Sequence, residues 1–198
     1  MGYLAAFVFI ILLVIGIYSF GYAAKRSSLF FVLLLETILG LLIIFPLLIA
    51  ADSLTVFQIF NKPDLNNWLW LGAAAIFGFV GGNYFSLLNL LLAGEKINSL
   101  LSPAITALTI VLSFFFLNEH LSGQQWCGII ITLVTIVWFL LQRDTSVVKW
   151  STGPAVSGIL TIICIALTII CTIKGAGNKV TFLQAIWIRL SLHSWFFW

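Results

Sequence analysis

Long apolar segments separated by short polar gaps dominate this chain of 198 residues. Each segment has about 18 to 26 residues, and a helix needs about 20 to cross the ~30 Å hydrocarbon core of a bilayer. The segments are continuously apolar, which favours helices over strands. We therefore predict an all-α, polytopic transmembrane helix bundle of six or seven helices, with spans at Tyr3–Tyr22, Leu29–Ala51, Trp68–Ala93, Ile97–Leu117, Gln124–Leu141, Gly153–Ile173 and Val180–Trp198.

Composition agrees with a membrane protein and narrows the function classes. Hydrophobic residues make up 62% of the chain and charged residues 8%, whereas a soluble domain carries about 25% charge. The net charge of +3 is spread over several gaps, so we expect no nucleic-acid partner. The three cysteines form no CxxC pair, no histidine has a ligand-spaced partner, and no phosphate-binding loop occurs. We expect no metal or other cofactor, and we do not expect ATP hydrolysis to drive the protein. The expected partners are the lipid bilayer and a small-molecule solute.

Two charged residues, Glu36 and Arg189, lie inside the predicted spans. A charge at bilayer mid-depth costs about 2.5–3.5 kcal/mol on insertion scales, so such a residue is a functional candidate by default. Glu36 could carry a proton that couples transport. Alternatively, it is a neutral acid or reaches water near the helix end. An ion pair between Glu36 and Arg189 would offset much of both insertion costs.

Small and polar residues form narrow stripes on consecutive spans. In the third span Gly78, Gly82, Ser86 and Asn89 share one face, with Asn83 beside it. This face predicts either close helix packing or the wall of a polar pathway. The fourth span carries a hydroxyl stripe next to Pro103, which frees one backbone carbonyl. These hydroxyls either face a solute or bond their own backbone. The candidate transport pathway comprises Glu36, Asn83, Ser86, Ser102, Pro103 and Thr106.

The fourth and fifth spans carry the most specific motif of the chain. It reads Ser102-Pro103, an apolar run, Leu117-Asn118-Glu119-His120-Leu121, and then Gln125 and Gly128-Ile129-Ile130. This order resembles the EamA repeat of the drug/metabolite transporter (DMT) superfamily, in which a proline-bearing helix ends in a leucine–glycine–glutamate-type turn. Asn118 stands where that turn usually has a small residue. Glu119 is expected to cap the next helix, with contact to the solute as the alternative.

The resemblance implies a domain organisation. Residues 1–145 resemble one five-helix EamA repeat, and residues 146–198 resemble the first one or two helices of a second, inverted repeat. The layout of residues 3–39 recurs at 156–192 and places Glu36 over Arg189. Because full-length relatives have ten helices, we interpret the chain as truncated.

The family implies secondary transport of a small metabolite, amino acid or drug-like solute by alternating access. It also implies a multi-pass protein of the bacterial inner membrane. The alternatives are a single-repeat, small-multidrug-type subunit acting as a homodimer, or an inactive membrane fragment. A membrane-embedded enzyme is disfavoured, since Asp52, Asp64 and Asp144 all fall in gaps. Basic residues favour a cytoplasmic Lys25 and Arg26, whereas the family implies a cytoplasmic N-terminus, so the orientation stays open.

Overall fold

The structure is a computed structural model that describes residues 15–16, 18–52, 63–141, 152–177 and 180–195. Every regular element within these ranges is a helix, which confirms the all-α prediction. Residues 18–26 are helical, but the first predicted span, Tyr3–Tyr22, lies mostly outside the described residues. The labelled elements are α2 (Leu29–Asp52), α4 (Leu65–Ala75), the π-helical η1 (Ile76–Asn83), α5 (Tyr84–Ala93), α6 (Glu95–Phe116), α7 (Gly123–Leu141), α8 (Thr152–Ala176) and α9 (Phe182–Trp195).

Four helical stretches in the described residues are long and apolar enough to cross a membrane: Leu29–Ile49, Leu65–Ala93, Ile97–Phe116 and Thr152–Ala176. They match the predicted second, third, fourth and sixth spans closely. The apolar part of α7, Gly123–Trp138, is shorter. Helix α9 has 14 residues and is therefore only about 21 Å long. The described helix is shorter than the predicted span Val180–Trp198, and Gln184, Arg189 and His193 make it the most polar of the candidates.

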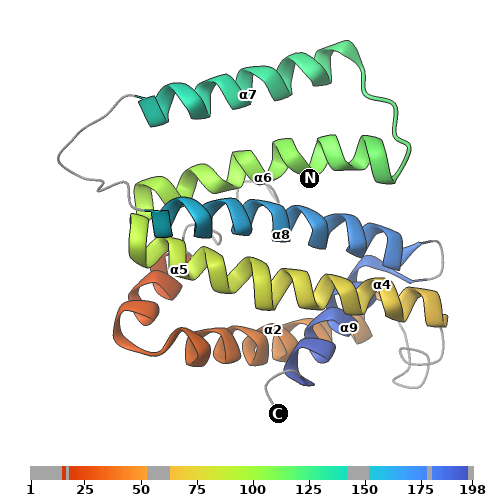
Figure 1. Ribbon diagram of the computed structural model, residues 1–198. Helices are drawn as coiled ribbons and strands as arrows, with labels where there is room; N and C mark the ends of the chain where they lie inside the picture. Colours follow the sequence, from red (N-terminus) through yellow and green to blue (C-terminus); the bar gives the residue numbers. More distant parts are fainter. Residues whose placement is uncertain (1–14, 17, 53–62, 142–151, 178–179, 196–198) are drawn as a thin grey trace.

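Helix α8 lies at the centre of the bundle. The consecutive elements α4, η1 and α5 form one continuous rod, and α8 contacts all three of them. Helix α8 also contacts α6. Figure 1 shows α7, α6, α8, the α4–α5 rod and α2 as roughly parallel rows, with α9 lying obliquely beside α2. Helix α9 packs against α2 and α4. The last two helices are thus part of the core, and the carboxyl-terminal third of the chain holds the preceding helices together.

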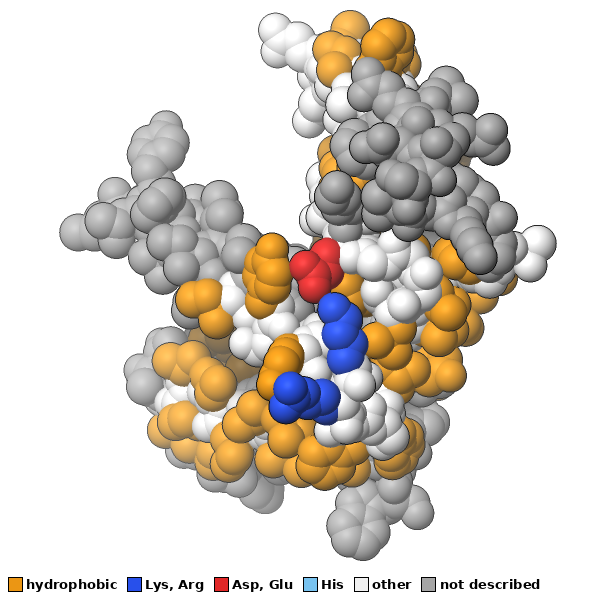
Figure 2. All heavy atoms as spheres, turned by 90° about the vertical axis from the view of Figure 1, so that its left-hand side faces the viewer, with side chains coloured by type: hydrophobic (Ala, Val, Ile, Leu, Met, Phe, Trp, Pro, Cys, Tyr) orange, Lys and Arg blue, Asp and Glu red, His pale blue; other side chains and the backbone are white. Residues whose placement is uncertain are grey.

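Large apolar side chains remain exposed on the outer helices. On α2 they include Leu42 and Ile43, and on α7 they include Ile131, Val134 and Trp138. At the end of the bundle that holds the α5–α6 turn, Lys25 Nζ lies 3.5 Å from Glu95 Oε1 in an exposed salt bridge. Figure 2 shows this end, where acidic and basic side chains gather amid hydrophobic ones. Apolar sides and a charged end are the distribution that a bilayer requires.

The glycine-rich face of the third span packs against α8. A Cβ built at Gly81 would lie 2.6 Å from Cys164 Sγ, and one at Gly175 would lie 2.8 Å from Leu71 Cγ and 3.1 Å from its backbone nitrogen. Nearby, Asn67 Nδ2 donates to the Gly175 carbonyl at 2.7 Å. Asn89 Nδ2 donates to the Pro154 carbonyl at 2.7 Å. Of the two interpretations of this face, the structure supports close helix packing along most of its length.

The turn between α6 and α7 depends on the backbone of Asn118. Its φ is +52°, in the left-handed region that glycine and asparagine enter most readily. Leu117, the C-cap of α6, precedes it, so Asn118 closes the helix in the way a glycine usually does. This explains how asparagine can replace the small residue that the EamA motif has at this place.

We expect Asn118→Ala to lower the free energy of unfolding by about 1 kcal/mol. The Cβ of alanine is sterically strained in the left-handed backbone region, and alanine lacks the polar side chain by which asparagine offsets this strain. Asn118→Gly should leave it unchanged or raise it slightly. Thermal unfolding of the purified protein in detergent would measure both. Equal melting temperatures for the alanine and glycine variants would contradict the left-handed assignment.

The cap of α7 differs from the sequence expectation. Gln125 N–H donates to Ser122 Oγ at 3.4 Å, and Ser122 N–H donates to Gln125 Oε1 at 2.7 Å. These reciprocal bonds form a capping box directly before Gly123. Glu119, which we expected to cap this helix, lies exposed four positions before its first residue. Apart from the chain neighbours and the nearby backbone of its own helix, no described atom lies within 4 Å of a Cβ built at Gly128, the other motif residue.

Candidate functional site

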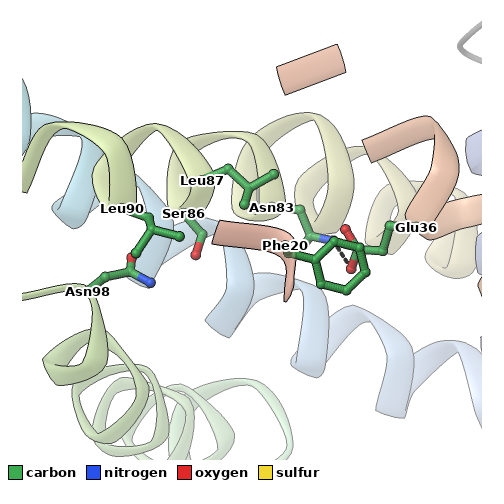
Figure 3. A pocket seen from close by; sticks show the side chains of 7 residues that line it. All are labelled: Phe20, Glu36, Asn83, Ser86, Leu87, Leu90 and Asn98. Carbon is green, nitrogen blue, oxygen red and sulfur yellow. Dashed lines mark hydrogen bonds between the residues drawn. The ribbon is translucent and has the colours of Figure 1, made fainter. Parts of the chain in front are cut away.

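Glu36 is the centre of the candidate site. It lies seven positions after Leu29, about 10 Å along α2 from its beginning. Its side chain is partly buried, and its Oε1 accepts a hydrogen bond from Asn83 Nδ2 at 3.3 Å (Figure 3). A buried acceptor of this kind needs such a donor, since water is scarce at that depth. The structure therefore joins two residues that the sequence placed separately in the pathway.

Asn83 is presented by the π-helical segment η1. The backbone N–H of Tyr84, directly after η1, donates to the carbonyl of Phe79, five residues earlier. Wide turns of this kind are rare and are frequently found at functional sites. Gly78, Gly81 and Gly82 lie within η1 and allow α8 to approach it closely. The glycine cluster was visible in the sequence, but the change from α to π geometry was not.

A first cavity, which we call the amide cavity, has a volume of about 160 Å³. Its polar groups come from Glu36 on α2, Asn83 on η1, Ser86 on α5 and Asn98 on α6. Figure 3 shows Ser86 and Asn98 on the side of Asn83 away from Glu36. The complete lining is Phe20, Glu36, Asn83, Ser86, Leu87, Leu90 and Asn98.

A second cavity, the charged cavity, has a volume of about 320 Å³. It lies between η1, α8, α9 and the Glu36 side of α2, and Arg189 and His193 are the polar groups that α9 contributes to it. Its lining is Glu36, Ala74, Ala75, Gly78, Phe79, Asn83, Ile165, Thr168, Ile169, Arg189, Leu190 and His193. Arg189 and His193 are four residues apart on α9 and share one helical face.

The two cavities have Glu36 and Asn83 in common. The hydrogen bond between these side chains therefore forms part of the wall that divides them. A chamber lined by amides and a chamber lined by a guanidinium group thus meet at this carboxyl group.

Glu36 and Arg189 face the same cavity and attract each other electrostatically. No salt bridge within 4.0 Å joins them in the described part of the chain. Instead, Arg189 Nη1 donates to Thr172 Oγ1 on α8 at 3.5 Å, while Glu36 is bonded to Asn83. The direct ion pair expected from the sequence stays a prediction.

The remaining pathway candidates lie elsewhere. Ser102 and Thr106 are exposed on α6, and neither they nor Pro103 are among the residues that line the two cavities. Thr106 Oγ1 donates to the Ser102 carbonyl at 3.1 Å. Thr109 and Ser113 also bond carbonyls of their own helix. The hydroxyl stripe thus follows the backbone-bonding alternative in this structure, and its role in the pathway stays a prediction.

Several lining residues were missed by the sequence reasoning. Asn98 is a polar residue in the first turns of a predicted span, a signal that could have been used. Thr168 lies on α8, where a series of threonines repeats at helical spacing. His193 became a lining residue only through the packing of α9 against its neighbours. Among the described residues, no cluster of three or more histidine, cysteine, aspartate or glutamate side chains could hold a metal ion.

Comparison with known proteins adds one positive finding. The model of the EamA-like transporter family matches residues 1–141. No curated protein and no solved structure gives a significant match. The matched region contains Glu36, Asn83 and the whole amide cavity, whereas Arg189 and His193 lie beyond it.

Proposed function

The chain belongs to the EamA-like transporter family, and we propose that it carries a small hydrophilic solute by alternating access at the cavities that meet at Glu36. The family and the membrane-length helices support an integral, multi-pass membrane transporter of the DMT type. We further propose the bacterial inner membrane as its location. The route of the solute, the coupling group and the location are proposed beyond what the family match itself gives.

The observation that carries this proposal is a carboxyl group held inside a span and facing two cavities. Such a group is costly to place there and typically marks a route for a solute or a proton. Transporters place their sites where a helix is interrupted, so that backbone and side-chain groups become available inside the membrane. In this chain, the π-helical segment that ends at Asn83 departs from regular α-helical geometry inside the third span.

Glu36 is the proposed coupling group. The polar and charged groups that face it in the charged cavity are Asn83, Arg189, His193 and Thr168. A carboxyl group that gains and loses a proton changes both its charge and its hydrogen bond to Asn83. Both changes would alter the wall between the cavities and thus link proton movement to solute movement.

Reconstitution into liposomes tests this function. Vesicles with the purified protein should show saturable uptake of radiolabelled small polar solutes under an imposed pH gradient. Uptake should fall to the level of protein-free vesicles when an ionophore dissipates the gradient. The absence of saturable flux across a panel of cationic, anionic, zwitterionic and neutral solutes would overturn the proposal.

A further inference from the structure

Polar side chains line the amide cavity from Glu36 toward the end of the bundle that holds the Lys25–Glu95 salt bridge, which we call the charged end. We propose that this cavity is a water-filled route along which protons reach Glu36 from the charged end, with Ser86 and Asn98 as its positioning residues. The inference rests on the proposed function, in which Glu36 is the coupling group, and it adds the side from which the proton comes. The charged cavity on the other side of Glu36 is then left to the solute.

The first step is the depth of the polar side chains. Lys25 precedes α2 and Glu95 is the first residue of α6, so their salt bridge places the beginnings of both helices at one end of the bundle (Figure 1). Helix α5 ends there too, since α6 follows it after one residue. Counted from these helix ends, the helical rise gives depths of about 5 Å for Asn98, about 10 Å for Ser86 and Glu36, and about 15 Å for Asn83 (Figure 3). The cavity therefore extends from Glu36 most of the way to the charged end.

The second step is the room for water. A cavity of about 160 Å³ holds about five water molecules, since each occupies about 30 Å³ in the liquid. A buried water typically needs about two to four polar partners. The wall supplies a carboxyl group, two amides and a hydroxyl group from α2, η1, α5 and α6. This lining can hold a chain of hydrogen-bonded waters.

The third step is the amide of Asn98. Its Oδ1 is buried and accepts no hydrogen bond from any residue in the described part of the chain, and a buried carbonyl oxygen without a donor is costly. The terminal torsion of asparagine is broad, so a rotation of this amide can turn the oxygen toward the cavity that the side chain lines. Water there would supply the missing donor. Asn98 thus favours water at the part of the route nearest the charged end.

The fourth step is the transfer itself. A proton from bulk water binds the first water of the chain, and each water accepts one proton as it passes another on. The Ser86 hydroxyl can take part in the same way, because it both donates and accepts. The last water donates to an oxygen of Glu36, so one O–H bond forms there and the carboxylate becomes a neutral acid. The amides of Asn83 and Asn98 orient the waters and exchange no proton.

The fifth step is the choice between the two cavities. Helices α5 and α9 pack against α2, and the charged or titratable groups that face Glu36 come from α9. They are Arg189 and His193, which line the charged cavity. Among the described residues that line the amide cavity, Glu36 alone carries a charge. A protonated water would be repelled by Arg189 in one cavity and would meet no fixed positive charge in the other. The amide cavity is therefore the favoured route for the proton.

Thiol accessibility tests whether water enters this cavity, and from which end. Single cysteines replace Ser86 or Asn98 in the full chain, in which alanine replaces Cys127, Cys164 and Cys171. Sealed membrane vesicles are prepared right side out and inside out, in a buffer without chloride. The probe is Ag⁺, a small hydrated cation that binds thiolates. Thiols that Ag⁺ has reached no longer react with a maleimide dye after the vesicles are dissolved.

Glu95→Cys marks the vesicles whose charged end faces the probe. Ser86→Cys and Asn98→Cys should lose their dye reaction in these vesicles at least about tenfold faster than in vesicles of the opposite orientation, because an ion crosses lipid at high cost. Val134→Cys, on the exposed apolar face of α7, is the control and should keep its dye reaction in both.

Transport provides the second readout. Ser86→Ala and Asn98→Leu should slow net uptake driven by a pH gradient by about tenfold or more, with an unchanged KM for the solute. Exchange of internal for external solute at equal pH needs no net proton movement and should keep its native rate. Ser86→Thr, which keeps the hydroxyl group, should retain net uptake. Thr135→Ala removes a hydroxyl group from the exposed side of α7 and should also retain it.

The inference is overturned if Ag⁺ reaches neither Ser86→Cys nor Asn98→Cys, if it reaches them from the end opposite to Glu95→Cys, or if Ser86→Ala slows exchange as much as net uptake. Its failure is distinguishable from failure of the proposed function. Proton-driven flux of the native protein together with any of these results would keep the transporter and reject the route. Thiols reached from the charged end of a protein without flux would support the route and reject transport.

Discussion

Replacing Glu36 by glutamine is expected to abolish accumulation of solute against its gradient while leaving the protein folded. The amide is nearly the same size and still offers an oxygen to Asn83, so the 3.3 Å hydrogen bond can persist. It cannot gain or lose a proton, however, and this ability is what the proposed coupling needs. We expect the initial rate of uptake driven by a pH gradient to fall at least about tenfold, since a catalytic proton-transfer group typically contributes 10²–10⁴-fold.

The pH dependence provides the second readout for Glu36→Gln. Uptake by the native protein should change with pH on the two sides of the membrane, whereas uptake by the variant should be flat. Glu95→Gln is the matched control, because Glu95 forms an exposed salt bridge with Lys25 and exposed pairs contribute little. A Glu36→Gln variant that accumulates solute as the native protein does, at every pH, would remove Glu36 from the coupling mechanism.

The second large effect is expected at Gly175, where α8 meets α4. An added methyl group would lie 2.8 Å from Leu71 Cγ and 3.1 Å from its backbone nitrogen, so the helices would have to separate. Separation would also lengthen the 2.7 Å hydrogen bond from Asn67 to the Gly175 carbonyl. Overpacking of this kind costs about 1–3 kcal/mol. We expect Gly175→Ala to lower the melting temperature in detergent clearly and to reduce the yield of monodisperse protein.

Gly128→Ala is the matched control for Gly175→Ala. Both glycines lie in helices, but a Cβ at Gly128 would meet no described atom within 4 Å apart from its chain neighbours and the nearby backbone of its own helix. Alanine favours the helix by up to about 1 kcal/mol over glycine, so this variant should be as stable as the native protein or more so. If the two alanine variants melted at the same temperature, the close approach of α4 and α8 would not be a source of stability.

The bilayer made much of the helical layout predictable. Apolar segments are unfavourable in water and charged side chains are unfavourable in lipid. The charged gaps around Lys25, Glu95 and Glu119 therefore indicated helix ends without any knowledge of packing. Among the described helices, the predicted first and last residues were least accurate for α9, where Arg189 and His193 interrupt the apolar pattern. Capping was misassigned for a local reason: Ser122 lies directly before α7, whereas Glu119 is too far from its first turn.

The candidate site was predictable only in part. Glu36 and Asn83 could be singled out because polar groups are costly in a span, but their mutual hydrogen bond depends on how α2 meets η1. The same long-range packing decides that Asn98, and not Ser102 or Thr106, lines the amide cavity. A hydroxyl stripe is ambiguous in any sequence, because serine and threonine can bond carbonyls of their own helix at little cost.

The wide turns of η1 decide the direction in which Asn83 points. A π-helical turn holds more residues than an α-helical turn, so the side chains that follow it point elsewhere than an uninterrupted α-helix would place them. Asn83 is the last residue of η1, and its amide meets the carboxyl group of Glu36 on α2. The same residues wound as a regular α-helix would aim this amide elsewhere, so the glycine-rich stretch both admits α8 and orients the donor.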